Sequence, residues 1–114
     1  MTFGRTLALD AMAGLLAGAI VVAPVYAADT EVSIDNFTYS PQQTTVKAGT
    51  TVTWVNHDDI PHTVMSKTFV FKSKALDTDD KFSFTFTTPG TFPYFCSLHP
   101  HMTGSIVVEA DAGK

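Results

Sequence analysis

The chain has 114 residues, which is too short for more than one ordinary domain. Its net charge is −4, from seven Lys and Arg against eleven Asp and Glu, and without a basic stripe it carries no nucleic-acid footprint. The single cysteine excludes the disulfides that usually stabilise small exported domains. A metal bond is then one reason for a lone cysteine to be present.

The first 27 residues are predicted to be a secretory signal peptide. Arg5 gives a positive start, residues 11–25 are almost wholly apolar or small, and Val25-Tyr26-Ala27 supplies a cleavage site. The apolar run is shorter than the roughly 20 residues of a spanning helix, and a retained N-terminal anchor is the alternative. Cleavage would leave residues 28–114 as one domain without a membrane span, which we expect in the periplasm or an equivalent compartment.

The remaining sequence consists of short strand patterns separated by turn signals, with no convincing helix. In chain order we expect strands at residues 32–39, 44–47, 51–56, 62–65, 81–87, 91–96 and 104–110. Residues 68–80 show the least clear secondary-structure pattern. The spacing predicts an all-β fold, a two-sheet antiparallel sandwich or barrel of seven or so strands. Its expected core is Val52, Trp54, Phe82, Phe84, Phe86, Ile106 and Val108.

One stretch, Cys96-Ser97-Leu98-His99-Pro100-His101-Met102, offers a thiolate, an imidazole and a thioether at its first, fourth and seventh positions. The loop of residues 56–62 delivers His62 at the start of a strand, and a sandwich can bring two such loops together at one pole. Two imidazoles and one thiolate in a plane, with a weak axial thioether, make a blue-copper ligand set. The sequence therefore predicts one copper ion at His62, Cys96, His99 and Met102, although zinc has similar ligand preferences.

Three pieces of the chain resemble the cupredoxin family, the type 1 blue copper proteins. They are Pro61-His62-Thr63-Val64, Phe92-Pro93-Tyr94-Phe95-Cys96 and the segment from Cys96 to Met102, followed by Gly104. The short ligand loop is most similar to that of the amicyanin-like members. The resemblance implies a Greek-key sandwich of about eight strands, with His62, Cys96 and His99 as in-plane ligands and Met102 as the axial one. It also implies that the edge of His99 is the electron port.

Two positions depart from the pattern of many relatives. Thr63 stands where an asparagine side chain braces the two ligand loops, and threonine has one hydroxyl of shorter reach. Leu98 stands where relatives often have proline, and it restores a backbone N–H. We expect that N–H to point at the Cys96 sulfur and to raise the reduction potential.

The complete ligand set predicts a carrier of single electrons between transient redox protein partners, with the chain a monomer. The alternative is a periplasmic copper-binding protein for storage or delivery of the ion. An enzyme is not expected, because copper oxidases and nitrite reductases need a further copper site built from more histidines, and two of the four histidines here are already used. His57 and His101 are interpreted as non-ligands.

Overall fold

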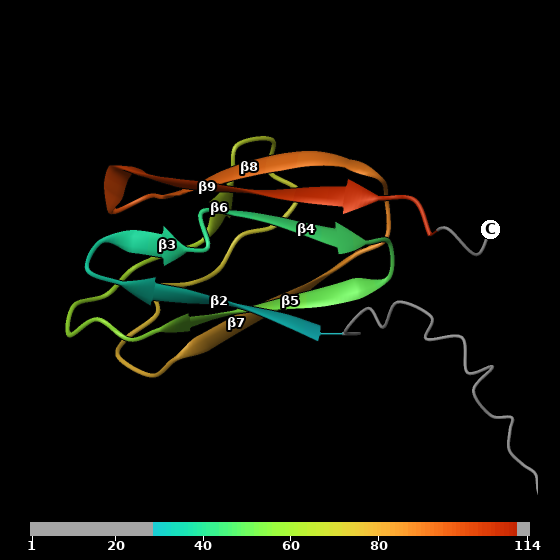
Figure 1. The fold of residues 1–114 in the computed structure, drawn as a ribbon. Coiled ribbons are helices and arrows are strands. Elements are labelled where there is room, and N and C mark those ends of the chain that lie inside the picture. Colours follow the sequence, from blue (N-terminus) through green and yellow to red (C-terminus); the bar gives the residue numbers. More distant parts are fainter. Residues whose placement is uncertain (1–28, 112–114) are drawn as a thin grey trace, which may run out of the picture.

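The computed structural model describes residues 29–111, which form eight strands and no helix. The predicted signal peptide and its cleavage site lie outside the described residues. No helix within the described range is long and apolar enough to cross a membrane. The strands form two four-stranded sheets that pack face to face (Figure 1).

Each sheet draws its strands from distant parts of the sequence. In spatial order the first sheet contains β3 (Thr38–Ser40), β2 (Asp29–Asp35), β5 (Thr50–Asn56) and β7 (Lys81–Phe86). The second contains β4 (Gln43–Lys47), β9 (His99–Glu109), β8 (Gly90–Cys96) and β6 (Met65–Ser66).

The predicted fold class, an all-β sandwich of two sheets, is confirmed. Within each sheet, however, one pair of neighbours is parallel: β2 with β5, and β4 with β9. The chain leaves the first sheet after β3, passes through β4 in the second and returns as β5 beside β2. This crossing between layers brings strands of the same direction together, so the sheets are mixed rather than wholly antiparallel.

Several strand boundaries differ by more than one residue from the sequence-based expectation. β2 begins at Asp29 rather than at residue 32, and the strand expected at residues 62–65 is reduced to β6 (Met65–Ser66), with His62 in an isolated bridge to Leu76. Residues 32–39 form two strands instead of one, because Asn36 and Phe37 adopt left-handed backbone conformations with φ of 52° and 58° and turn the chain. The last strand starts at His99, earlier than expected, because residues 97–98 form a tight turn after β8.

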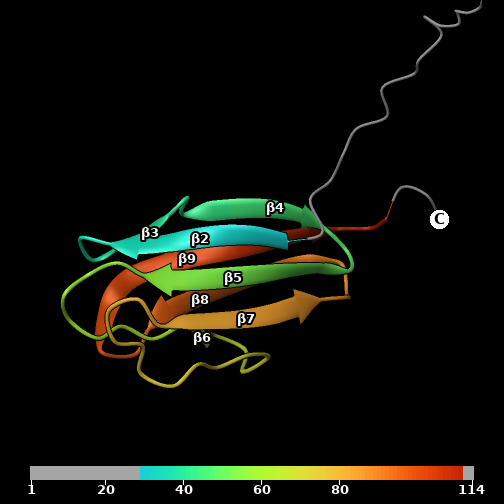
Figure 2. The same ribbon diagram turned by 90° about the horizontal axis from the view of Figure 1, so that it is seen from below.

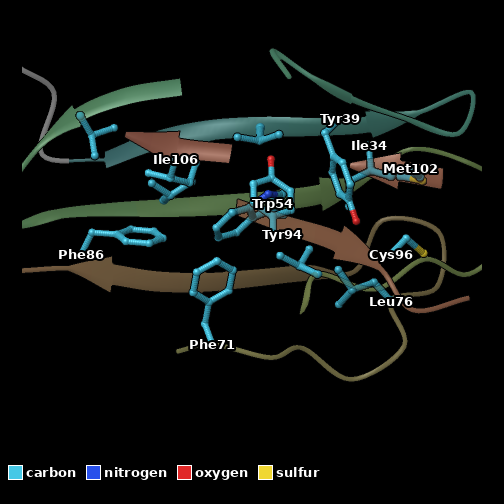
Figure 3. Close-up of a cluster of buried hydrophobic side chains, with 14 of the residues drawn as sticks. Ile34, Tyr39, Trp54, Phe71, Leu76, Phe86, Tyr94, Cys96, Met102 and Ile106 are labelled. Atoms are coloured by element: carbon cyan, nitrogen blue, oxygen red, sulfur yellow. The ribbon is translucent and has the colours of Figure 1, made fainter. Parts of the chain in front are cut away.

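The core lies between the sheets and contains Trp54 at its centre (Figure 3). Trp54 packs against Phe71 and Tyr94, with ring centroids 5.7 and 5.4 Å apart. Of the predicted core, Phe82 and Phe84 are only partly buried, and the other five residues are buried. Cys96 and Met102 lie together at one end of the cluster (Figure 3).

That end of the core is opposite the end where the described chain begins and finishes. The start of β2 and the end of β9 lie at one end of the sandwich (Figures 1 and 2). The loop after β5 and the turn between β8 and β9 lie at the other end, as the convergence of two loops at one pole requires.

Candidate metal centre

The fold brings three of the four predicted ligands into one cluster. Candidate ligand atoms of His62, Cys96 and His99 all lie within 4.8 Å of one another. The Cys96 Sγ atom is 3.7 Å from Nδ1 of His62 and 3.6 Å from Nδ1 of His99. Metal–nitrogen bonds of about 2.0 Å and a metal–sulfur bond of about 2.3 Å, at angles of about 110–120°, require nitrogen–sulfur separations of about 3.5–3.7 Å. The donors are therefore spaced to share one ion.

Met102 reaches the same end of the molecule through an irregularity in the β8–β9 pairing. Phe95 pairs with Thr103, but the next pair is Cys96 with His99, so residues 100–102 have no partner on β8. These extra residues form a bulge, which redirects side chains where a regular ladder would alternate them. Met102 is only 5% exposed, and it lines the same surface pocket as His99.

Thr63 connects the upstream loop (residues 56–63) to the downstream segment (residues 96–104). Its Oγ1 accepts a hydrogen bond from the Ser97 N–H at 2.7 Å and lies 2.8 Å from the Ser97 hydroxyl oxygen. Its backbone N–H points at the Cys96 sulfur, 3.3 Å away. The brace between the loops is therefore retained with threonine, despite its shorter reach.

The expected hydrogen bond from Leu98 to the Cys96 sulfur is not found. Within residues 29–111, the sulfur has hydrogen-bond contacts with Thr63, His62 and His99, and none with Leu98. The backbone N–H that withdraws density from the thiolate thus belongs to the residue directly after His62.

The His62 ring is oriented by a carboxylate that the sequence analysis missed. Asp58 Oδ2 lies 2.7 Å from His62 Nε2, and an ionised carboxylate can only accept there. Nε2 therefore carries the ring proton, and the Nδ1 lone pair is left for a metal. Burial works to raise the pKa of Asp58, but the N–H groups of Phe37 and Asn36 and the His62 ring lower it to about 2.

Phe37 is a second residue that the sequence analysis did not assign to the site. Its ring meets the rings of His62 and His99 edge-on, with centroids 5.4 and 5.0 Å apart, and it remains 51% exposed. It reaches this place because Asp58 accepts both turn N–H groups, from Asn36 at 2.7 Å and from Phe37 at 3.0 Å. The sequence did contain a signal for Asp58, because it is a carboxylate four residues before a candidate ligand. It contained no signal that would have placed Phe37 at the site.

The two other histidines stay outside the cluster. His57 and His101 are exposed and neither belongs to the group of candidate ligand atoms. His101 instead helps to line a surface pocket of about 420 Å³, together with Phe37, Leu98, His99, Pro100 and Met102. The candidate site therefore opens toward solvent at a mostly apolar surface.

A two-sheet β-sandwich with a buried cysteine and two histidines at one pole is the architecture of small copper proteins, and this chain belongs to the cupredoxin family. The profile of the Cupredoxin-like domain matches residues 11–108. Amicyanin-alpha of Methylorubrum extorquens is 36% identical over 108 residues, which cover 90% of this chain and 91% of that protein. Amicyanin of Paracoccus versutus is 36% identical over 96 residues, covering 75% of this chain and 73% of the relative.

The solved structures agree with the sequence relatives. A purple cupredoxin from Nitrosopumilus maritimus superposes with a TM-score of 0.68 at 34% identity, covering 71% of this chain and all of that one. An oxidised amicyanin variant gives a TM-score of 0.69 at 36% identity, covering 72% and 83% of the two chains. The chain is thus a small blue copper electron-transfer protein with copper as its cofactor, and it is not an enzyme.

Proposed function

We propose that His62, Cys96, His99 and Met102 bind one type 1 copper ion, and that the protein is an exported carrier of single electrons between redox partners. The observation that carries this proposal is the spacing of Cys96 Sγ from the two Nδ1 atoms, 3.6 and 3.7 Å. The bound copper would supply a one-electron redox couple.

The donor set fits this ion in both oxidation states. Thiolate and thioether are soft ligands that favour Cu(I), and imidazole suits copper generally. His62 and Cys96 are fully buried, and hydrogen bonds to Asp58 and Thr63 hold them in place. Side chains held in this way move little when an electron is gained or lost, which favours rapid transfer.

The pocket around His99 is the natural place for a transient partner to dock. It is lined mainly by apolar side chains, and Leu98 and Phe37 within it are each about half exposed, at 52% and 51%. A partner that covers this surface approaches the partly exposed His99 ring without displacing any of the four donors. The partners themselves are expected to be proteins whose own redox centres lie near their surface.

Export is proposed from the N-terminal sequence together with the use of cysteine. The lone cysteine is buried and placed between two imidazoles, where a bound metal would protect it from the oxidation and mispairing expected in an oxidising compartment. The secretory signal pattern at residues 1–27 fits the same compartment. Edman sequencing or mass spectrometry of the protein purified from its source would show whether the mature chain starts at Ala28.

A copper titration tests the carrier function. Added Cu(II) should bind in one equivalent, produce an intense visible thiolate-to-copper absorption and give a reversible one-electron voltammetric wave. The double variant His57→Ala/His101→Ala is the control and should keep both signals. A colourless protein that passes its copper readily to a chelator, with no reversible wave, would contradict the carrier proposal and favour copper delivery.

A further inference from the structure

A second exposed apolar feature lies on the flank of the sandwich, away from the candidate copper site. The 65–74 hairpin starts in β6, and its two arms are joined by the bridge between Met65 and Lys72. Its base is firmly attached: the Lys67 N–H donates to Pro93 of β8 at 2.9 Å, and the Ser73 N–H donates to Val64 at 2.8 Å. Figures 1 and 2 show the segment after β6 outside the two sheets.

The tip of this hairpin presents apolar side chains to solvent. Phe69 is 78% exposed and Val70 is 44% exposed, whereas the next residue, Phe71, is buried in the core. Phe69 has a φ of 62°, a left-handed conformation that is an outlier for a bulky residue and is usually left to Gly or Asn. A phenylalanine there gains little burial within the described chain, so the packing of the fold does not explain it.

The apolar surface continues from the tip toward the sheet. Val70 lines a surface groove of about 290 Å³ with Phe84, Phe92 and three threonine side chains. Among residues 29–111, none that lines this groove is charged.

The hairpin is also the basic region of an acidic protein. Residues 60–76 contain Lys67, Lys72 and Lys74 and no acidic residue, in a chain of net charge −4. All three lysines are exposed, and none forms an ion pair with another residue of the range 29–111. The protein as a whole repels anions because of its net negative charge, but the three lysines of the hairpin attract them.

From this arrangement we infer that the 65–74 hairpin binds the surface of an anionic lipid bilayer. The Phe69 and Val70 side chains insert at the boundary between the lipid headgroups and the acyl chains, and the three lysines contact the headgroups. The order of the groups matches a bilayer: apolar side chains at the apex and cations set back along the arms. Because the segment after β6 stands outside the sheets (Figures 1 and 2), an acidic protein partner would need a matching socket, whereas a fluid bilayer adapts to it.

Binding through the hairpin leaves the electron port accessible. The hairpin projects from the side of the sandwich beyond β8, whereas the β8–β9 turn that precedes His99 lies at one end (Figures 1 and 2). A carrier attached in this way would search for partners along the membrane surface. This inference does not depend on the copper ligands.

Vesicle co-sedimentation tests the inference. The copper-loaded chain beginning at Ala28 is the correct form, because residues 29–111 contain both complete sheets and the core, and the apolar N-terminal segment would itself bind lipid. It should bind vesicles of mixed phosphatidylglycerol and phosphatidylcholine at low salt, bind weakly at high salt, and not bind pure phosphatidylcholine.

Two pairs of matched variants locate the contact. Phe69→Ser should weaken vesicle binding about tenfold, whereas Phe37→Ser, at the other exposed phenylalanine, should not change it. Lys72→Gln should weaken binding about fivefold, and Lys81→Gln on β7 should have a much smaller effect. The visible copper band should be unchanged in Phe69→Ser and Lys72→Gln, which shows that both variants remain folded.

Two results would overturn the inference. One is a wild-type protein that fails to sediment with anionic vesicles at low salt. The other is a Phe69→Ser variant that binds vesicles as well as wild type does, together with a Lys72→Gln variant that loses binding both to vesicles and to polyglutamate, a soluble acidic polymer used as a lipid-free probe. That second pattern would identify a purely electrostatic site, such as one for an acidic protein.

Discussion

The upstream loop and the downstream segment contribute to one site but are positioned by different physics. His62 comes from the upstream loop, and polar side chains orient it: Asp58 binds its ring, and Asn56 binds the backbone of Ile60 and Leu76. The downstream segment contributes Cys96, His99 and Met102 within seven residues, and strand pairing with a bulge positions them. The lone upstream candidate is therefore oriented mainly by polar side chains, whereas the three downstream candidates are positioned mainly by the local backbone, with Thr63 linking the two regions.

The largest expected effect comes from removing the Cys96 sulfur from the downstream segment. Cys96→Ser keeps the size of the buried side chain but removes the only sulfur that can form a thiolate. We expect complete loss of the intense visible absorption on copper addition, with the free energy of unfolding of the metal-free protein changed little. Absorption spectra of the copper-treated variant check this; a blue Cys96→Ser protein would contradict the assignment.

The second prediction tests the backbone of the downstream segment without touching a donor. A Cβ atom added at Gly104 would lie 2.5 Å from the ring carbon Cζ of Tyr94, which is fully buried and cannot move aside easily. Gly104→Ala should therefore lower the free energy of unfolding by about 3 kcal/mol, through overpacking. Urea unfolding measures it, with Thr103→Ala as the control; an unchanged midpoint would mean that Tyr94 is free to shift.

The third prediction concerns the Asp58 carboxylate, which orients the His62 ring in the upstream loop. Asp58→Asn removes the negative acceptor of the His62 ring proton, and outer partners of this kind are worth about 10–100-fold in metal affinity. We expect about a tenfold loss of copper affinity in a competition titration. Asp59→Asn, which changes the same charge at the exposed neighbouring position, should leave affinity unchanged. Equal losses in both variants would point to general electrostatics instead of ring orientation.

The fourth prediction concerns the link between the two regions. Thr63→Val keeps the shape of the side chain but removes the oxygen that accepts the Ser97 N–H. We expect the free energy of unfolding to fall by about 1 kcal/mol, while Thr63→Ser retains most of the wild-type value. Guanidinium unfolding of the metal-free proteins measures the difference. If serine and valine behave alike, the hydroxyl does not brace the loops.

The smallest expected effect is a pH dependence of the metal-free protein. The pKa of Asp58 is lowered to about 2, below its value of about 3.9 in an unfolded chain. Its ionised form therefore stabilises the fold above about pH 4, and this contribution is lost as the pH falls toward about 2. Over that interval the free energy of unfolding should decline less steeply in Asp58→Asn than in wild type. Parallel curves for the two proteins would contradict the lowered pKa.

Many of the strands could be predicted from the sequence, because a strand produces a local alternation of apolar and polar residues. The alternation of Phe82, Phe84 and Phe86 with polar residues predicted β7 closely, and the TVTWVN run predicted β5 to within one residue. The boundary inside residues 32–39 was missed because the turn at Asn36 and Phe37 depends on a carboxylate more than twenty positions away. No local pattern records such a contact.

The sequence by itself was enough to propose the four candidate donors, because Cys96, His99 and Met102 lie within seven residues and His62 follows a loop that comes after a strand. It also determined the sandwich class, because alternation and turn signals are local properties of the chain. Only the tertiary structure decided how the donors are supported: Asp58 on the His62 ring, Phe37 against both imidazoles, and a basic hairpin on the flank. Those contacts join segments far apart in the chain, and their geometry exists only after the two sheets have packed.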